Sequence, residues 1–392
     1  MYRLGSRLTG AAVASLLYSI AAAAQAPAPA GTEAPAQAAP MLAAAPTTET
    51  PPPAPATPPV AAAEPVAAKP AVETLRFGTI NMTTQSTFKQ HLVPLVEAIG
   101  RESGGKMKIE LGELNKFGRP SELLPKVEKG ELDIASTVQG YHPGRFPRSE
   151  VMELPMIFPS AAAGTEALWK LFEEGLIAED YKNLKVLALY VLPPYSVFFA
   201  DHQIASPRDL RGVSVRAPSR TIGEALDRLG MVSLGLPFNV AGDYVAQGLL
   251  EAVNLTWDTV STTKVGNGVL LNHVRQGLDL RFAAPALMIV MNKSRYEGLP
   301  EELRKAIDRH TGRELAMTMA ASRDAADAEA RDKFRAESGK QVFELNPDHR
   351  KEVVERVQPV IAKWSAEKKA AGIDGEALLT RARALIAAYE KR

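Results

Sequence analysis

The residue of this chain best suited to hold a small anion is Arg216, which follows a short predicted strand over 213–215. A guanidinium is a rigid planar fork that can donate two parallel hydrogen bonds to one carboxylate. Open α/β sheets bind their ligands at the carboxyl ends of strands, and Arg216 stands at such an end, before Pro218. The pattern predicts that Arg216 holds an organic carboxylate; the alternative is an ordinary surface ion pair.

Catalytic and metal-binding patterns are absent from the sequence. There is no nucleophile elbow, no phosphate-binding loop and no dinucleotide fingerprint. The absence of cysteine excludes disulfides, thiol nucleophiles and Cys-ligated zinc. His142 is the only histidine near the expected cleft, and no partner for a general base is in view. We therefore predict no catalytic residue, no metal and no cofactor.

The elements that must position Arg216 alternate between strands and helices from residue 74 onward. This alternation predicts an α/β fold with parallel, doubly wound sheets. A nearly all-apolar run follows at 185–192 and is typical of a strand covered on both faces. The first predicted strands are 75–80, 106–111 and 132–136.

The segment around Arg216 resembles the periplasmic solute-binding proteins of tripartite ATP-independent (TRAP) transporters, the DctP family. Further segments resemble this family in the same order along the chain, over roughly 74–364. The matching positions near the arginine are Pro207, Asp209, Leu210, Gly212, Arg216 and Pro218, and the further segments are 102–106, 127–134, 141–147, 153–158 and 249–258.

This resemblance implies a two-lobed periplasmic binding protein. Its two doubly wound sheets would be joined by hinge strands, and a long helix would span both lobes. The expected domains are a first part of lobe I over 74–196, lobe II with Arg216 over 197–284, and a return to lobe I with long C-terminal helices over 285–392.

In the DctP family, the arginine at this position binds the ligand carboxylate, so the resemblance assigns that role to Arg216. Trp257 is one of the further ligand contacts predicted below, but packing of its side chain in the core is an equally good interpretation. Sugar-acid binders of the family carry Asn where Leu255 stands and a second Arg near the first crossing strand, and both features are missing here. We therefore expect an apolar or aromatic monocarboxylate. The further predicted ligand contacts are Tyr141, Tyr195, Ser196, Phe238, Leu255, Thr256 and Trp257.

The N-terminal residues predict export from the cytoplasm. Residues 1–26 combine a basic start, an apolar run and an Ala-x-Ala cleavage site, as in a signal peptide, although a retained anchor is the alternative. Residues 27–73 are rich in Ala and Pro and predict a disordered linker. The formal net charge of +1 argues against nucleic acid as a partner. We expect a periplasmic protein.

Together these features predict a receptor that captures a small organic acid and delivers it to the membrane permease subunits of a TRAP transporter. The alternative is a periplasmic ligand sensor that presents its closed form to a signalling partner. A periplasmic enzyme is a third interpretation and would require turnover of the bound acid.

Overall fold

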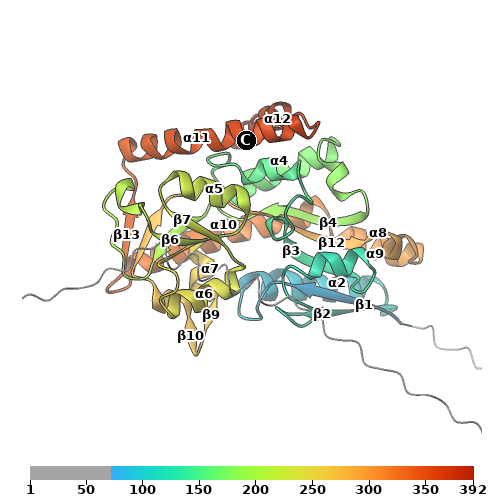
Figure 1. Ribbon diagram of the computed structural model, residues 1–392. Helices are drawn as coiled ribbons and strands as arrows, with labels where there is room; N and C mark the ends of the chain where they lie inside the picture. The colour runs from blue at the N-terminus through green and yellow to red at the C-terminus, as the bar shows by residue number, and fades with distance from the viewer. Residues whose placement is uncertain (1–71) are drawn as a thin grey trace, which may run out of the picture. The chain divides into compact units, whose positions relative to one another are not determined.

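The computed structural model of the protein describes residues 72–392 (Figure 1). The predicted signal peptide and almost all of the predicted linker lie outside the described residues. The described part contains two large β-sheets with helices packed against them. No helix in this part combines the length and the apolar character needed to cross a lipid bilayer.

The first sheet has five strands and, with the helices packed on it, forms the first lobe. Strands β1, β2 and β3 are parallel to one another, and β12 runs antiparallel to both of its neighbours, β3 and β4. Their spatial order is β2 (Met107–Gly112), β1 (Glu73–Thr79), β3 (Ile134–Val138), β12 (Ala286–Asn292) and β4 (Leu184–Val191).

The second sheet has six strands and forms the centre of the second lobe. Strand β5 runs antiparallel to both neighbours, whereas the other pairings are parallel. A small hairpin of β9 (Lys264–Val265) and β10 (Gly268–Val269) stands apart. The spatial order of the six strands is β13 (Gln341–Glu344), β11 (Gln276–Asp279), β5 (Ser196–Phe199), β8 (Ala252–Leu255), β6 (Ser214–Ala217) and β7 (Val232–Gly235).

The predicted two-sheet α/β fold is confirmed, and its two antiparallel strands are the ones that carry the chain between the lobes. The chain leaves the first sheet at the end of β4 and enters the second as β5, then leaves it at the end of β11 and returns as β12. The neighbouring strands run toward the junction of the lobes and end there. Strands β5 and β12 begin at that junction and run away from it, so they are antiparallel to their neighbours.

Helices pack on both sheets, and α10 contacts elements of both lobes: α4 and β4 in the first, α7 and β13 in the second. Gly312, with φ of 94°, separates α9 from this long helix. The helices are α2 (Val93–Glu102), α3 (Leu123–Glu128), α4 (Ala161–Glu173), α5 (Arg220–Arg228), α6 (Phe238–Ala246), α7 (Trp257–Thr262), α8 (Lys293–Glu297), α9 (Glu301–His310), α10 (Arg313–Ala336), α11 (Pro347–Ala370) and α12 (Gly375–Glu390).

The C-terminal segment, predicted over 285–392 as a return to lobe I plus long C-terminal helices, contacts both lobes. Strand β13 pairs with β11 in the second sheet, and α11 packs on α5, whereas α12 packs on α4 (Figure 1). An unpaired strand edge exposes backbone hydrogen-bonding groups. Strand β13 pairs with the backbone hydrogen-bonding groups of β11 that would otherwise be exposed. The chain therefore passes through the second lobe before α12 packs on the first.

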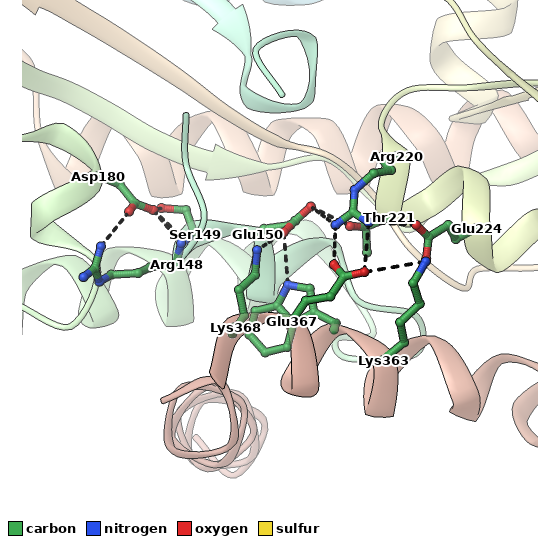
Figure 2. A network of polar contacts seen from close by, with 11 residues as sticks. Arg148, Ser149, Glu150, Asp180, Arg220, Thr221, Glu224, Lys363, Glu367 and Lys368 are labelled. Atoms are coloured by element: carbon green, nitrogen blue, oxygen red, sulfur yellow. Dashed lines mark hydrogen bonds and ion pairs between the residues drawn. The ribbon is translucent and has the colours of Figure 1, made fainter. Parts of the chain in front are cut away.

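A polar network around Glu150 joins both lobes to α11 (Figure 2). Glu150 belongs to the short 3₁₀ helix Ser149–Glu153 of the first lobe and accepts a hydrogen bond from the Thr221 hydroxyl of α5 at 2.7 Å. It also accepts hydrogen bonds from Trp364 Nε1 at 3.1 Å and from Lys368 Nζ of α11. One carboxylate of the first lobe therefore contacts two helices, α5 and α11, that are distant from it in sequence.

A second acid of the same 3₁₀ helix, Glu153, is buried at the junction of the lobes. Its side chain accepts a hydrogen bond from the backbone N–H of Ala286, at the start of β12, at 3.2 Å. Burial raises the pKa of the Glu153 carboxyl to about 7; the neighbouring Glu150 charge adds to this, and hydrogen bonds from Ser219 and Ala286 oppose it. The folded chain therefore binds this proton more tightly than the unfolded chain does.

We predict that this carboxyl makes the stability of the protein depend on pH. The contribution of Glu153 to the free energy of unfolding is greatest below pH 4.5, the ordinary pKa, and falls as the pH rises through about 7. Each unit of pKa shift corresponds to about 1.4 kcal/mol, so the rise from 4.5 to about 7 limits the loss of stability to at most about 3.5 kcal/mol. Urea denaturation of the wild type and of Glu153→Gln between pH 5 and 8 measures how the free energy of unfolding of each protein changes with pH. A difference between the two that stays constant with pH contradicts the prediction.

Candidate functional site

A cavity lies where the strand ends of the two sheets meet. Its volume is only about 40 Å³ in this arrangement of the lobes. The first lobe contributes residues that follow β1 and β3 and that end β4; the second contributes residues of β6, β8, α6 and α7. Helix α10 adds Arg323. This is the strand-end position at which open α/β sheets bind ligands.

Arg216 lies in β6, lines this cavity and is only 1% exposed. Its Nε donates to the backbone oxygen of Leu236 at 2.7 Å, and Nη1 donates to that of Asn254 at 3.0 Å. Nη2 donates to the Tyr141 hydroxyl at 3.2 Å. No carboxylate within residues 72–392 forms an ion pair with it. These bonds use three of the five N–H groups of the guanidinium, and the Tyr195 hydroxyl is a further hydrogen-bond partner of it.

Tyr141 connects the first lobe to this guanidinium. It belongs to the 3₁₀ turn Gln139–Tyr141 after β3, and its hydroxyl also accepts a hydrogen bond from the backbone N–H of Phe238 at 3.3 Å. A hydroxyl has two acceptor positions and one donor. Because the two acceptor positions are filled from the second lobe, the O–H of Tyr141 can donate to a third group.

A second guanidinium, that of Arg323, lines the same cavity and is 5% exposed. It forms a buried ion pair with Asp258 of α7. Nη1 also donates to Ser86 Oγ at 3.1 Å, and Nη2 donates to Thr259 Oγ1 at 3.2 Å and Thr256 Oγ1 at 3.4 Å. The cavity thus holds one arginine with a carboxylate partner and one without.

Aromatic rings supply much of the remaining wall. Tyr190 is the last residue but one of β4, Tyr195 precedes β5, and Phe238 begins α6. Burial raises the pKa of Tyr190 to about 12 and also raises the pKa of Tyr195, against which the charge of Arg216 acts. Both phenols therefore stay protonated at neutral pH. Aliphatic side chains complete the wall: Ile80, Val138, Leu192, Leu255 and Leu287.

The family model described as "Bacterial extracellular solute-binding protein, family 7", DctP, matches residues 77–368. The chain belongs to this family. Family 7 proteins are solute-binding receptors that act outside the cytoplasm, so the chain is a receptor and not an enzyme.

Solved structures of TRAP solute-binding proteins resemble the chain over its globular part. One, from Rhodoferax ferrireducens and in complex with copurified benzoate, is 29% identical, covers 81% of this chain and 98% of its own, and has a TM-score of 0.76. Another, from a marine metagenome and described as specific for aromatic acid ligands, contains metahydroxyphenylacetate. It is 28% identical, covers 81% of this chain and 99% of its own, and has a TM-score of 0.76.

A curated relative is similar over nearly the same part of the chain. It is named outer membrane transporter protein TsaT, from Comamonas testosteroni. The identity is 24% over 318 residues, which are 80% of this chain and 92% of the relative.

The structure brings together five of the eight predicted ligand contacts of this family 7 protein. The other three do not line the cavity: Ser196 donates to Asp279 at 3.3 Å, and Thr256 caps α7. Trp257 packs edge to face on Phe198 and Phe334, which is the core-packing alternative. The five that line the cavity are Arg216, Tyr141, Tyr195, Phe238 and Leu255.

His142, considered near the cleft from the sequence, lines a different recess beside Glu150 and Lys368. Burial lowers its pKa to about 4, with Arg145 contributing. The imidazole is therefore neutral at neutral pH and lies apart from Arg216.

Sequence reasoning missed Arg323, because the search for a second arginine covered only the first crossing strand. A signal was nevertheless present in α10. Positions spaced three or four residues apart on one helix face are buried together, and Arg323 falls on the face defined by Met319 and Ala330. An arginine in such a row must find a polar environment, here the cavity and Asp258.

Proposed function

We propose that this family 7 protein captures a small aromatic monocarboxylate, with Arg216 as the carboxylate clamp, and delivers it to the membrane permease of a TRAP transporter. The observation that carries the proposal is the buried Arg216 guanidinium without a carboxylate partner in the described chain. A buried charge is costly unless it is paired. A ligand carboxylate would supply the missing partner.

The guanidinium keeps donor capacity for this role. Its terminal nitrogens carry four N–H groups, of which Asn254 O and the Tyr141 hydroxyl accept two. A ligand carboxylate is a strong acceptor for the capacity that is left. The Tyr141 O–H can add a further hydrogen bond from the first lobe.

The aromatic preference rests on the cavity wall and on the relatives. Tyr190, Tyr195 and Phe238 present ring surfaces, which favour offset or edge-to-face contact with a ligand ring. The two solved structures with 28–29% identity contain benzoate and metahydroxyphenylacetate. Both ligands are aromatic monocarboxylates.

Ligand binding would couple to closure of the lobes, because Arg216 belongs to the second lobe and Tyr141 to the first. A ligand that contacts both lobes binds the closed arrangement better and increases its population. Closure also excludes water, which strengthens the pairing between guanidinium and carboxylate.

We predict that Arg216→Ala weakens benzoate binding by about 2–5 kcal/mol, because a desolvated carboxylate loses its partner. Arg216→Lys should also weaken binding, since an ammonium lacks the planar fork. Isothermal titration calorimetry measures both effects. The exposed Arg211 of the same lobe, changed to Ala, is the control. Unchanged affinity in both Arg216 variants would exclude the clamp.

We predict that Gly140→Ala weakens benzoate binding, although residue 140 does not line the cavity. A Cβ at Gly140 would lie 2.5 Å from the Ser219 Cβ of the second lobe, so the lobes could not approach as they do here. Apparent affinity falls in proportion to the population of the binding-competent state, and we expect a loss of about tenfold or more.

Calorimetry with benzoate tests Gly140→Ala, and Gly100→Ala is the matched control. Gly100 lies in α2, and a Cβ added there would meet only the Met107 backbone oxygen, at 3.7 Å. Equal affinities for both glycine variants would show that binding does not require this approach of the lobes.

A further inference from the structure

The hydrogen-bonding capacity of Arg323 is almost, but not completely, used by the protein. Its terminal nitrogens donate to Asp258, Ser86, Thr256 and Thr259. Its Nε is buried and has no partner in the described part of the chain. Arg323 therefore retains one N–H, on Nε, without an acceptor among residues 72–392.

The charge of Arg323 is also balanced within the protein. Asp258 forms the ion pair, and Asp327 lies next to it, accepting the backbone N–H of Asp258 at 3.2 Å. Burial raises the pKa of Asp327 to about 6, and the charge of Arg323 opposes the rise. Asp327 is thus largely ionised at neutral pH. A further negative charge near Arg323 would meet two carboxylates.

Gln85 adds a second donor to this end of the cavity. It is 5% exposed, and its oxygen accepts hydrogen bonds from Met82 N at 2.9 Å and Asn81 Nδ2 at 3.2 Å. Its amide nitrogen has no protein acceptor among residues 72–392, and the adjacent Ser86 accepts from Arg323. At this end of the cavity, the side-chain groups of Arg323 and Gln85 that have no protein partner are therefore N–H donors.

The two guanidiniums share none of their hydrogen-bond partners, so the cavity has two different polar ends. We propose that Arg323 is a specificity residue that donates to an uncharged oxygen on the ligand, such as a ring hydroxyl or carbonyl, while Arg216 holds the carboxylate. The substrate class is then an oxygen-substituted aromatic monocarboxylate and not a dicarboxylate. This inference rests on the proposed function.

The experiment compares the affinities of one protein for matched ligands. Calorimetry on the full chain uses benzoate, 3-hydroxybenzoate, 4-hydroxybenzoate and the corresponding benzene dicarboxylates. A hydrogen bond from a charged donor should make at least one hydroxybenzoate bind about tenfold more tightly than benzoate. The dicarboxylates should bind more weakly than that hydroxybenzoate, because Asp258 already compensates the charge of Arg323 and a second carboxylate would lack a cationic partner.

Arg323→Lys is the main variant, since it keeps a positive charge opposite Asp258 but removes the Nε–H. The advantage of the hydroxybenzoate over benzoate should disappear in this variant. If this variant unfolds, the double variant Arg323→Met with Asp258→Asn removes both charges together. Arg335→Gln, an exposed site on the same helix, is the control and should keep the native preference.

Three results would overturn the inference: no hydroxybenzoate binds more tightly than benzoate, a dicarboxylate binds most tightly, or the preference survives in the folded Arg323 variants. Benzoate binding that depends on Arg216 would leave the proposed function intact in each case. If no aromatic acid binds the native chain, the proposed function fails as well. The result with benzoate therefore separates failure of the Arg323 inference from failure of the proposed function.

Discussion

The structure depends on a positive charge, that of Arg216, held inside the protein without a negative one beside it. Two backbone oxygens and one tyrosine hydroxyl orient the guanidinium, and these neutral groups offset only part of the cost of removing it from water. Arg323 is the contrasting case, because Asp258 compensates its charge. Neither arginine is free to leave the cavity, since each is fixed by several partners.

The direction of the strands explains why these groups converge. Every strand that ends at the junction delivers its following residues there, and the two crossing strands connect the lobes without a helix between them. Residues from six or more separate segments consequently line one small cavity. A binding site of this kind requires no long loop of its own.

Two helical segments join the lobes away from the crossing strands. Helix α10 contacts both sheets and carries Arg323, while α11 reaches the Glu150 network through Trp364 and Lys368 (Figure 2). The first connection lies at the cavity and the second lies outside it. The network around Glu150 therefore links the first lobe to α5 of the second lobe and to α11 at a place apart from the cavity.

The sequence by itself determined the alternation of strands and helices, the strand that carries Arg216 and the motifs of the family, because these are local patterns. It did not determine that β5 and β12 run antiparallel, that β13 joins the second sheet, or that Trp257 packs in the core while Leu255, two residues earlier, lines the cavity. Nor did it reveal Arg323, which is 107 positions from Arg216 in the numbering but lines the same cavity. Only the tertiary structure decided these points, because pairing, burial and the sharing of a cavity depend on contacts between segments far apart in the chain.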